Sequence, residues 1–393
     1  MKTKFGVIGA NPRLRANFVF ANFDRNTCEL VALCDNDPES LTAFREAYPE
    51  MANVKTYGDY RELLADPGVE AVFIMVRDQF HEEMAVAALE AGKAVYLEKP
   101  MAITIEGCDR ILKTAYRTGR KLMVGHNMRC MDFVLKMKEV IDSGIIGEIE
   151  SVWCRHFICY GSCYFRHFCA ERENCTGLLL QKGSHDIDII HWLAGGYSRR
   201  VVAMGKLSVY NRTGDRLKPG EKPDRKASFR DDCWPPLEIK GLNPHIDVED
   251  HSMLLMQLDN GVQASYEQCM YAPDNERNYT FIGTRGRVEN IGDYHGDVYI
   301  HVWTQRGFRS NPDIVYHIKP RGGSHGGSDS LILKAFFDFI ADDVPPSVTP
   351  VAARNAVAAG YLGHYSMRNG NIPCDVPPLE PELIRYFENG QRK

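Results

Sequence analysis

The first 126 residues alternate short apolar runs with segments of helical character, and this alternation restricts the fold more than any other feature of the chain. Runs of this length and composition are typical of buried parallel strands. They are KFGVIG at 4–9, ELVALCD at 29–35, AVFIMV at 71–76, AVYL at 94–97 and KLMVG at 121–125. Because the segments between them can supply crossover helices, the pattern predicts a doubly wound parallel sheet with helices on both faces.

The rest of the chain follows a different pattern. Residues 148–160 are typical of the first strand of a new sheet, and alternating runs follow from about residue 201. An Asn-Gly pair at 260–261 and an Arg-Gly pair at 285–286 are typical of hairpin turns between such runs. We therefore expect an α/β protein: an N-terminal Rossmann domain with a doubly wound parallel sheet, then a C-terminal α+β domain with a mostly antiparallel open sheet.

The length of 393 residues also favours two domains, since a domain usually has about 100 to 200 residues. We place the boundary where the alternation ends, so that 1–126 form the first domain and 127–393 the second. A late helix at 351–367 is expected to pack back against the first domain.

Composition and charge exclude several classes of protein. Hydrophobic residues make up 44% and charged residues 25%, as in a folded globular protein. The net charge is −5 and no stripe of basic residues is present, which argues against nucleic acid as the main partner. We expect no membrane association and a cytoplasmic location, because there is no signal-peptide core and no uninterrupted apolar stretch of about 18 residues. The twelve cysteines lack the paired spacing of a zinc site, so we expect reduced thiols and no metal.

A partial dinucleotide fingerprint follows the first predicted strand. Gly9 fills the first glycine position, whereas Asn11 and Leu14 occupy the second and third. Asn tolerates left-handed backbone angles, and Arg13 could supply charge to a pyrophosphate. Asp35, at the end of the second strand, is placed to accept hydrogen bonds from ribose hydroxyls and to repel a 2′-phosphate, which favours NAD over NADP. The alternative is that Asp35 only caps the turn that follows.

Several motifs in order resemble the glucose-fructose oxidoreductase and myo-inositol dehydrogenase family (Gfo/Idh/MocA). They are GVIG near the start, a His before a helix, ALEAGKAVYLEKPM, GHNMR and a G-x-H-D-x-D-x-x-x-W segment at 183–192. The resemblance implies an NAD-binding first domain, and a second domain whose open sheet carries the substrate site and often an oligomer contact. A homodimer or homotetramer is expected on the same ground. Together with the fingerprint, it marks these cofactor-binding residues: Gly9, Asn11, Arg13, Asp35, Val76, Arg77, His81, Glu98, Lys99 and Asn127.

Lys99 is a candidate catalytic residue on its position alone. It follows a predicted parallel strand, and the carboxyl ends of such strands form the crevice where open α/β sheets bind ligands. The next residue, Pro100, restricts the backbone. A lysine with its ordinary pKa of about 10.4 is cationic and stabilises a developing alkoxide, and it becomes a base if burial lowers that pKa. The alternative is a surface lysine paired with Glu98.

A second catalytic group is predicted on a helix at 179–193. Lys182, His185 and Asp186 are spaced i, i+3 and i+4 and so share one helix face. By resemblance, His185 matches the catalytic histidine that works with the EKP lysine. The inositol dehydrogenase pattern has an Asp four residues earlier, where this chain has Gln181, which cannot act as a base. We therefore assign part of that role to Lys182, and we expect Asp186 to contact substrate.

Three residues upstream of this helix are candidates for binding a hydroxyl-rich or anionic substrate, because phenol, guanidinium and imidazole groups suit such ligands. They are Tyr164, Arg166 and His167.

The sequence thus favours an NAD-dependent oxidoreductase acting on a sugar, glycoside or cyclitol, with Lys99, His185 and Lys182 as the catalytic residues. One alternative is a glycosidase that keeps NAD bound and works by transient oxidation at C3, elimination, hydration and re-reduction. The other, of a different class, is a non-catalytic NAD or sugar sensor. The pair of Lys99 and His185 speaks against a sensor, which has no need of proton transfer.

Overall fold

The computed structural model describes residues 2–12, 15–218, 220–221, 234–293, 296–308, 310–319 and 321–392. The chain divides into two compact units. Unit 1 consists of Met1–Cys130, Gly322–Arg354 and Pro378–Lys393, and unit 2 consists of Met131–Arg321 and Asn355–Pro377. The boundary expected after residue 126 lies four residues before the end of the first segment of unit 1, and unit 1 also contains two segments from the C-terminal part of the chain.

Unit 1 contains a six-stranded sheet in the order β3-β2-β1-β4-β5-β6, in which every neighbouring pair is parallel. The strands are β1 (Thr3–Ile8), β2 (Cys28–Cys34), β3 (Lys55–Tyr57), β4 (Ala71–Ile74), β5 (Ala94–Leu97) and β6 (Leu122–Val124). The strand order reverses between β1 and β4, which is the topological switch point of a doubly wound sheet. The predicted parallel fold of the first domain is confirmed.

The helices of unit 1 begin and end at residues that suit helix termini. The Asp37 side chain accepts a hydrogen bond from the Glu39 N–H at the start of α2, and Thr104 does the same for Gly107 in α5. Gly119, at φ +67°, ends α5 in the left-handed conformation that glycine favours. The helices are α1 (Asn17–Asn22), α2 (Pro38–Ala47), α3 (Tyr60–Ala65), α4 (His81–Glu90), α5 (Ile105–Thr118), α11 (Ser328–Asp342) and α13 (Pro381–Glu388).

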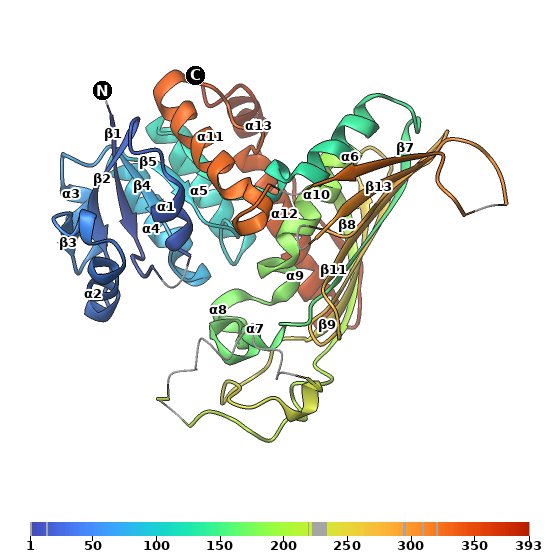
Figure 1. Cartoon of the computed structure of the whole chain (residues 1–393), viewed down its shortest axis with the longest axis horizontal. Coiled ribbons are helices and arrows are strands. Elements are labelled where there is room, and N and C mark those ends of the chain that lie inside the picture. Colours follow the sequence, from blue (N-terminus) through green and yellow to red (C-terminus); the bar gives the residue numbers. More distant parts are fainter. Residues whose placement is uncertain are drawn as a thin grey trace. The chain divides into compact units, whose positions relative to one another are not determined.

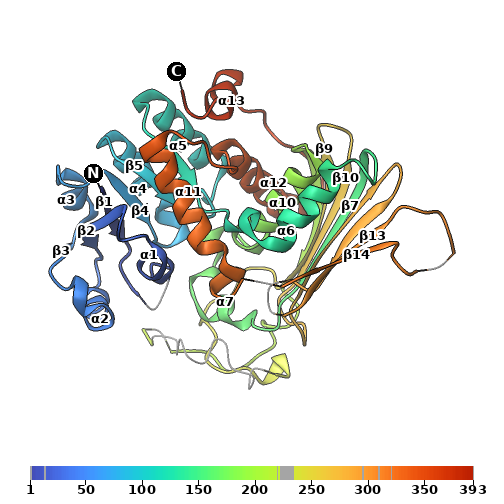
Figure 2. The same ribbon diagram turned by 45° about the horizontal axis from the view of Figure 1, so that its top comes forward.

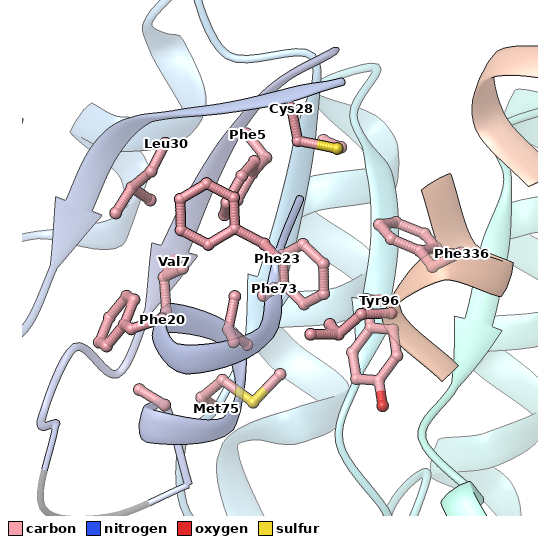
Figure 3. Packing of buried hydrophobic residues seen from close by; sticks show 14 of the residues in the cluster. Phe5, Val7, Phe20, Phe23, Cys28, Leu30, Phe73, Met75, Tyr96 and Phe336 are labelled. Carbon is pink, nitrogen blue, oxygen red and sulfur yellow. The ribbon is translucent and has the colours of Figure 1, made fainter. Parts of the chain in front are cut away.

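The core of unit 1 joins the sheet to a helix from far along the sequence. Phe5 of β1 and Phe73 of β4 pack edge to face at 5.3 Å, and Phe336 of α11 packs on Phe73 at 5.1 Å (Figure 3). Figures 1 and 2 show α11 beside α1 and the strands. Aromatic packing of this kind contributes both buried apolar area and favourable ring geometry, so α11 is an integral part of this unit.

Unit 2 is built on a nine-stranded sheet in the order β14-β13-β12-β11-β7-β10-β9-β8-β15. All described pairs are antiparallel except β7 with β10, so the sheet is mixed and mostly antiparallel, as predicted. The expected turns at 260–261 and 285–286 join β9 to β10 and β11 to β12. The strands are β7 (Ile149–Phe157), β8 (Ser198–Lys206), β9 (His251–Leu258), β10 (Gln263–Cys269), β11 (Glu276–Gly283), β12 (Arg287–Ile291), β13 (Val298–Trp303), β14 (Ile314–Ile318) and β15 (Cys374–Asp375).

Helices α6 and α10 contact one face of this sheet, where Figure 2 shows them side by side. The opposite face is exposed and carries large apolar side chains, among them Met204, Leu255 and Met253. In the described part of the chain, no helix is both long and apolar enough to span a bilayer. The helices of unit 2 are α6 (Asp132–Asp142), α7 (Ser162–Arg166), α8 (Arg172–Cys175), α9 (Leu178–Gln181), α10 (Gly183–Ala194) and, from residue 355 on, α12 (Pro350–Arg368).

Candidate active site

The loop after β1 passes close to the end of β4, and Gly9 makes this approach possible. Its φ is +89°, and a Cβ at this position would lie 2.6 Å from the Met75 carbonyl oxygen. A side chain would therefore be both strained and obstructed. Asn11 fills the second position of the fingerprint, and its side-chain amide donates a hydrogen bond to Ser40 Oγ at 3.0 Å. The loop is thus held against α2 by Asn11 and against β4 by Gly9.

Asp35 lies between this loop and the start of α2. Its Oδ2 accepts a hydrogen bond from the Ala10 N–H at 3.0 Å, and its Oδ1 accepts one from the Asp37 N–H at 3.0 Å. Burial raises the pKa of Asp35, while the two backbone donors oppose the shift. Each carboxylate oxygen of Asp35 can accept a further hydrogen bond in addition to these. Asp35 can therefore cap the turn and also accept hydrogen bonds from ribose hydroxyls.

Arg15 links three parts of unit 1 and was not singled out by sequence reasoning. Its guanidinium forms an ion pair of 3.1 Å with the fully buried carboxylate of Asp78, and it lies within hydrogen-bond distance of the carbonyl oxygens of Val76 and Lys99. The signal in the sequence was an acidic residue, Asp78, four residues after the end of the buried strand β4, since a buried carboxylate needs a cation nearby. Arg13, which we expected to supply charge to a pyrophosphate, lies outside the described residues.

Lys99 follows β5 at the carboxyl end of the parallel sheet, as the sequence predicts. Its neighbour Glu98 lies 4.0 Å from Arg15. His81 differs from expectation: it is fully buried, with Nδ1 2.6 Å from the Pro100 carbonyl oxygen and Nε2 3.3 Å from that of Val76. An imidazole held in this way fixes the backbone around Lys99. It has no exposed surface with which to contact a cofactor, so its predicted role as a cofactor ligand is corrected to a supporting one.

The remaining expected cofactor residues lie at the ends of β4 and β6. Arg77 is exposed in the loop that follows β4. Asn127 follows β6 and donates a hydrogen bond of 2.8 Å to Asp329, the second residue of α11. The same carboxylate lies 3.1 Å from Nδ1 of His325, a residue that sequence reasoning left unassigned. Asn127 is therefore tied to α11 through a buried carboxylate.

In unit 2, Lys182 lies between α9 and α10, and His185 belongs to the first turn of α10. His185 is 8% exposed and Lys182 is half-buried. Burial, reinforced by the charge of Arg277, lowers the pKa of Lys182 to about 8. An amine with this pKa changes protonation state close to neutral pH, which is the range in which a proton-transfer group is most effective. Gln181, at the position of the missing Asp, is 2% exposed.

Asp186 differs from the prediction that it contacts substrate. It is fully buried, and its carboxylate accepts hydrogen bonds from Tyr266 Oη at 2.8 Å and Tyr279 Oη at 2.5 Å. Arg277 Nε and His156 Nδ1 lie 2.8 and 3.0 Å away. Burial alone would raise the pKa of Asp186, but Arg277 and His156 outweigh it and hold the pKa well below its usual range. Asp186 thus binds α10 to strands of the sheet and is enclosed by protein.

The four partners of Asp186 were missed by sequence reasoning. His156 stands opposite Arg277 in the register of β7 and β11, and Tyr266 and Tyr279 both stand opposite Cys154. The available signal was a set of polar residues at inward-facing strand positions, since such residues need partners when buried.

Arg166 also departs from its predicted role in substrate binding. It is 6% exposed, and its guanidinium donates to the Lys240 carbonyl oxygen at 3.1 Å and to Ser162 Oγ at 3.2 Å. It therefore ties α7 to a later segment. Tyr164 and His167 are half-buried at either side of it, and burial raises the pKa of Tyr164 well above its ordinary value. The phenol stays protonated and able to donate a hydrogen bond.

Within the described residues, no group of three or more His, Cys, Asp or Glu side chains is arranged to hold a metal ion.

Comparison with known families agrees with this arrangement. A model described as an oxidoreductase family with an NAD-binding Rossmann fold (Gfo/Idh/MocA) matches residues 3–126, and the model of the family's C-terminal domain matches residues 134–289. Together they cover more than half of the sequence. The chain belongs to this family. The resemblance seen in the motifs is confirmed, and the match to the NAD-binding domain confirms NAD as the cofactor.

Individual Gfo/Idh/MocA relatives differ in how much of the chain they match. YteT of Bacillus subtilis, named as an oxidoreductase, is 26% identical over 385 aligned residues, which cover 87% of this chain and 88% of YteT. Inositol 2-dehydrogenase of Salmonella typhimurium is 33% identical over 166 residues, 42% of this chain and 46% of the enzyme. The chain thus aligns with less than half the length of that dehydrogenase.

Solved structures show the same fold over nearly the whole chain. Levoglucosan dehydrogenase, in complex with NADH and levoglucosan, has a TM-score of 0.75 at 20% identity and covers 96% of this chain and 100% of its own. Aldose-aldose oxidoreductase from Caulobacter crescentus, complexed with glycerol, has a TM-score of 0.71 at 19% identity, covering 95% and 100%. At these identities the likeness shows the fold alone.

Proposed function

We propose that this protein is an NAD-dependent dehydrogenase that moves a hydride between the nicotinamide and a hydroxyl-bearing carbon of a sugar, glycoside or cyclitol. The observation that carries the proposal is the lowered pKa of Lys182, which lies three residues before His185 on the α9–α10 segment. Lys99, at the carboxyl end of β5, is the third residue to which we assign a role in handling the proton. The relatives named above, one acting on inositol and one bound to levoglucosan, support polyhydroxylated substrates.

The residues of unit 1 fit an NAD cofactor. Gly9 leaves the loop after β1 without a side chain, so that a pyrophosphate could approach the backbone, and Asp35 offers a carboxylate to ribose hydroxyls. When bound, NAD accepts the hydride. Arg15 and His81 hold the backbone around Val76 and Lys99. The Lys99 side chain therefore extends from a backbone segment whose position is fixed.

In the oxidation direction, His185 accepts the proton of the substrate hydroxyl while the hydrogen on the same carbon leaves as hydride. The Lys99 ammonium donates a hydrogen bond to the developing alkoxide and stabilises its negative charge. Lys182, whose pKa is about 8, relays or shares the proton with His185. In this assignment Lys182 accepts the proton that Gln181 cannot accept, because an amide side chain does not titrate.

Asp186 and Arg166 enter this proposal as structural residues. The Asp186 network fixes the first turn of α10, which includes His185, and so orients the catalytic groups. Tyr164 and His167 remain the proposed substrate contacts from the segment before α8. A phenol and an imidazole can both hydrogen-bond to ring hydroxyls without adding a charge.

The first experiment is a substrate screen with purified protein. We would supply NAD with a panel of free sugars, cyclitols and glycosides, and follow NADH by absorbance; in parallel, nitrophenyl α- and β-glycosides without added cofactor would report release of the aglycone. We expect NADH formation with at least one free sugar or cyclitol. Release of nitrophenol without net NADH would contradict the dehydrogenase and support a glycosidase with retained NAD. No product in either assay would support the sensor.

A further inference from the structure

The N-terminus of α9 is held by a side chain from a distant helix. The residue before α9, Gly177, has no side chain to cap it. The backbone N–H of Leu179, in the first turn, instead donates a hydrogen bond of 3.0 Å to Nε2 of His364 in α12. Because the first N–H groups of a helix lack partners within the helix, this imidazole satisfies a donor that would otherwise be buried without an acceptor.

The two segments approach so closely that glycine is needed on both sides. Gly177 has a φ of +155°, and a Cβ on it would lie 2.2 Å from Cε1 of His364. A Cβ on Gly360, one turn before His364 in α12, would lie 2.6 Å from the Leu179 carbonyl oxygen. Real side chains do not tolerate such distances, so the position of α9 against α12 is fixed by contact as well as by the hydrogen bond.

A buried carboxylate, Glu249, determines which nitrogen of the His364 ring carries the proton. His364 is 1% exposed, and its Nδ1 lies 3.5 Å from Oε2 of Glu249. Glu249 is also bound by Arg368 at 2.9 and 2.7 Å and by Arg172 at 2.9 Å. Burial lowers the pKa of His364, so the ring is neutral at neutral pH. With its proton on Nδ1 toward Glu249, the ring presents Nε2 as an acceptor to Leu179, which is the tautomer that the cap requires.

The hydrogen bond between Leu179 and His364 lies close to the proposed catalytic residues, because Leu179 is three residues before Lys182 and six before His185. We propose that His364 is a positioning residue, which fixes α9 through Leu179 and thereby sets the placement of Lys182 and His185. This inference rests on the proposed function, because that proposal gives Lys182 and His185 their catalytic roles. His364 itself is assigned no contact with substrate or cofactor. A misplacement of about 1 Å in reacting groups lowers rates by about 100-fold, so a remote cap of this kind affects turnover.

Two variants separate the two contacts of the ring. In His364→Gln the side-chain amide oxygen reaches the position of Nε2 and accepts from Leu179, whereas in His364→Asn the shorter amide reaches toward Glu249 only. We expect kcat to fall about 10- to 100-fold in His364→Asn and to stay within about threefold in His364→Gln, with KM and NADH affinity changed less than threefold in both. Amide hydrogen exchange in residues 178–182 should be at least about tenfold faster in His364→Asn than in His364→Gln.

The control is His251→Gln, which alters another histidine-carboxylate pair of unit 2, His251 with Glu267 at 3.0 Å, and should leave kcat and exchange unchanged. Equal kcat in the Gln and Asn variants, with both folded by thermal melting, would overturn the positioning role. Equal exchange would show that His364 does not cap α9, and would overturn it as well. If the wild-type protein oxidises no sugar or cyclitol, the proposed function fails, while the exchange comparison still decides whether His364 fixes α9.

Discussion

The ammonium group of Lys182 lies where both burial and the charge of Arg277 disfavour a proton, which lowers its pKa to about 8. Below pH 8 the group is a cation, and above it the group is neutral and able to accept a proton. We therefore predict that kcat/KM for substrate oxidation rises as pH increases through about 8. In Lys182→Met this rise should disappear and kcat should fall. A pH–rate profile of both proteins tests this, and an unchanged rise near pH 8 in the variant would assign it to another group.

Also at the scale of residues, the sequence was enough to select candidate residues for the site, but it did not predict which other residues they contact. The spacing of Lys182, His185 and Asp186 predicted one continuous helix over 179–193, whereas the structure has two helices, α9 and α10, that meet at Lys182. The spacing could not show that Asp186 is enclosed, because its partners Tyr266 and Tyr279 lie 80 and 93 residues away in sequence. Burial of this kind depends on tertiary packing, which spacing along one helix does not contain.

At the scale of elements, α10 is attached to its sheet through the buried ion pair of Asp186 and Arg277. We predict that Asp186→Asn lowers the free energy of unfolding by about 3 to 5 kcal/mol, because it leaves a buried guanidinium without its counter-charge. Urea unfolding of the variant measures this. Asp375→Asn is the matched control: it breaks the exposed pair of Arg200 and Asp375 between β8 and β15 and should change stability little. If the two substitutions lowered the free energy of unfolding by the same amount, the buried ion pair of Asp186 would not be what attaches α10 to the sheet.

The elements themselves could largely be predicted, since strands and helices of unit 1 follow local periodicity and glycine or acidic caps. The place of α11 could not be predicted. Its residues Phe336 and Phe337 join a core formed by β1 and β4, more than 250 residues earlier in the sequence. An amphipathic pattern shows that a helix has a buried face, but it does not show which sheet covers that face.

At the scale of the whole molecule, the proposed catalytic residues belong to two units of one family fold. Unit 1 contains the NAD-binding sheet and Lys99, and unit 2 contains His185, Lys182 and the network that holds them. The ordered motifs were enough to predict the family and the cofactor, because each is short and local. The substrate could not be predicted in this way, because the proposed substrate contacts, Tyr164 and His167, lie in the segment before α8, whose arrangement no motif specifies.

The measurement that tests the central claim most directly is the comparison of turnover and NADH binding in Lys99→Ala. With a substrate from the screen, we predict that turnover falls about 100- to 10,000-fold while the dissociation constant for NADH, from fluorescence titration, changes less than about threefold. Lys334→Ala, on the exposed face of α11, is the control and should change neither. Wild-type turnover in Lys99→Ala would remove this lysine from the mechanism and contradict the account.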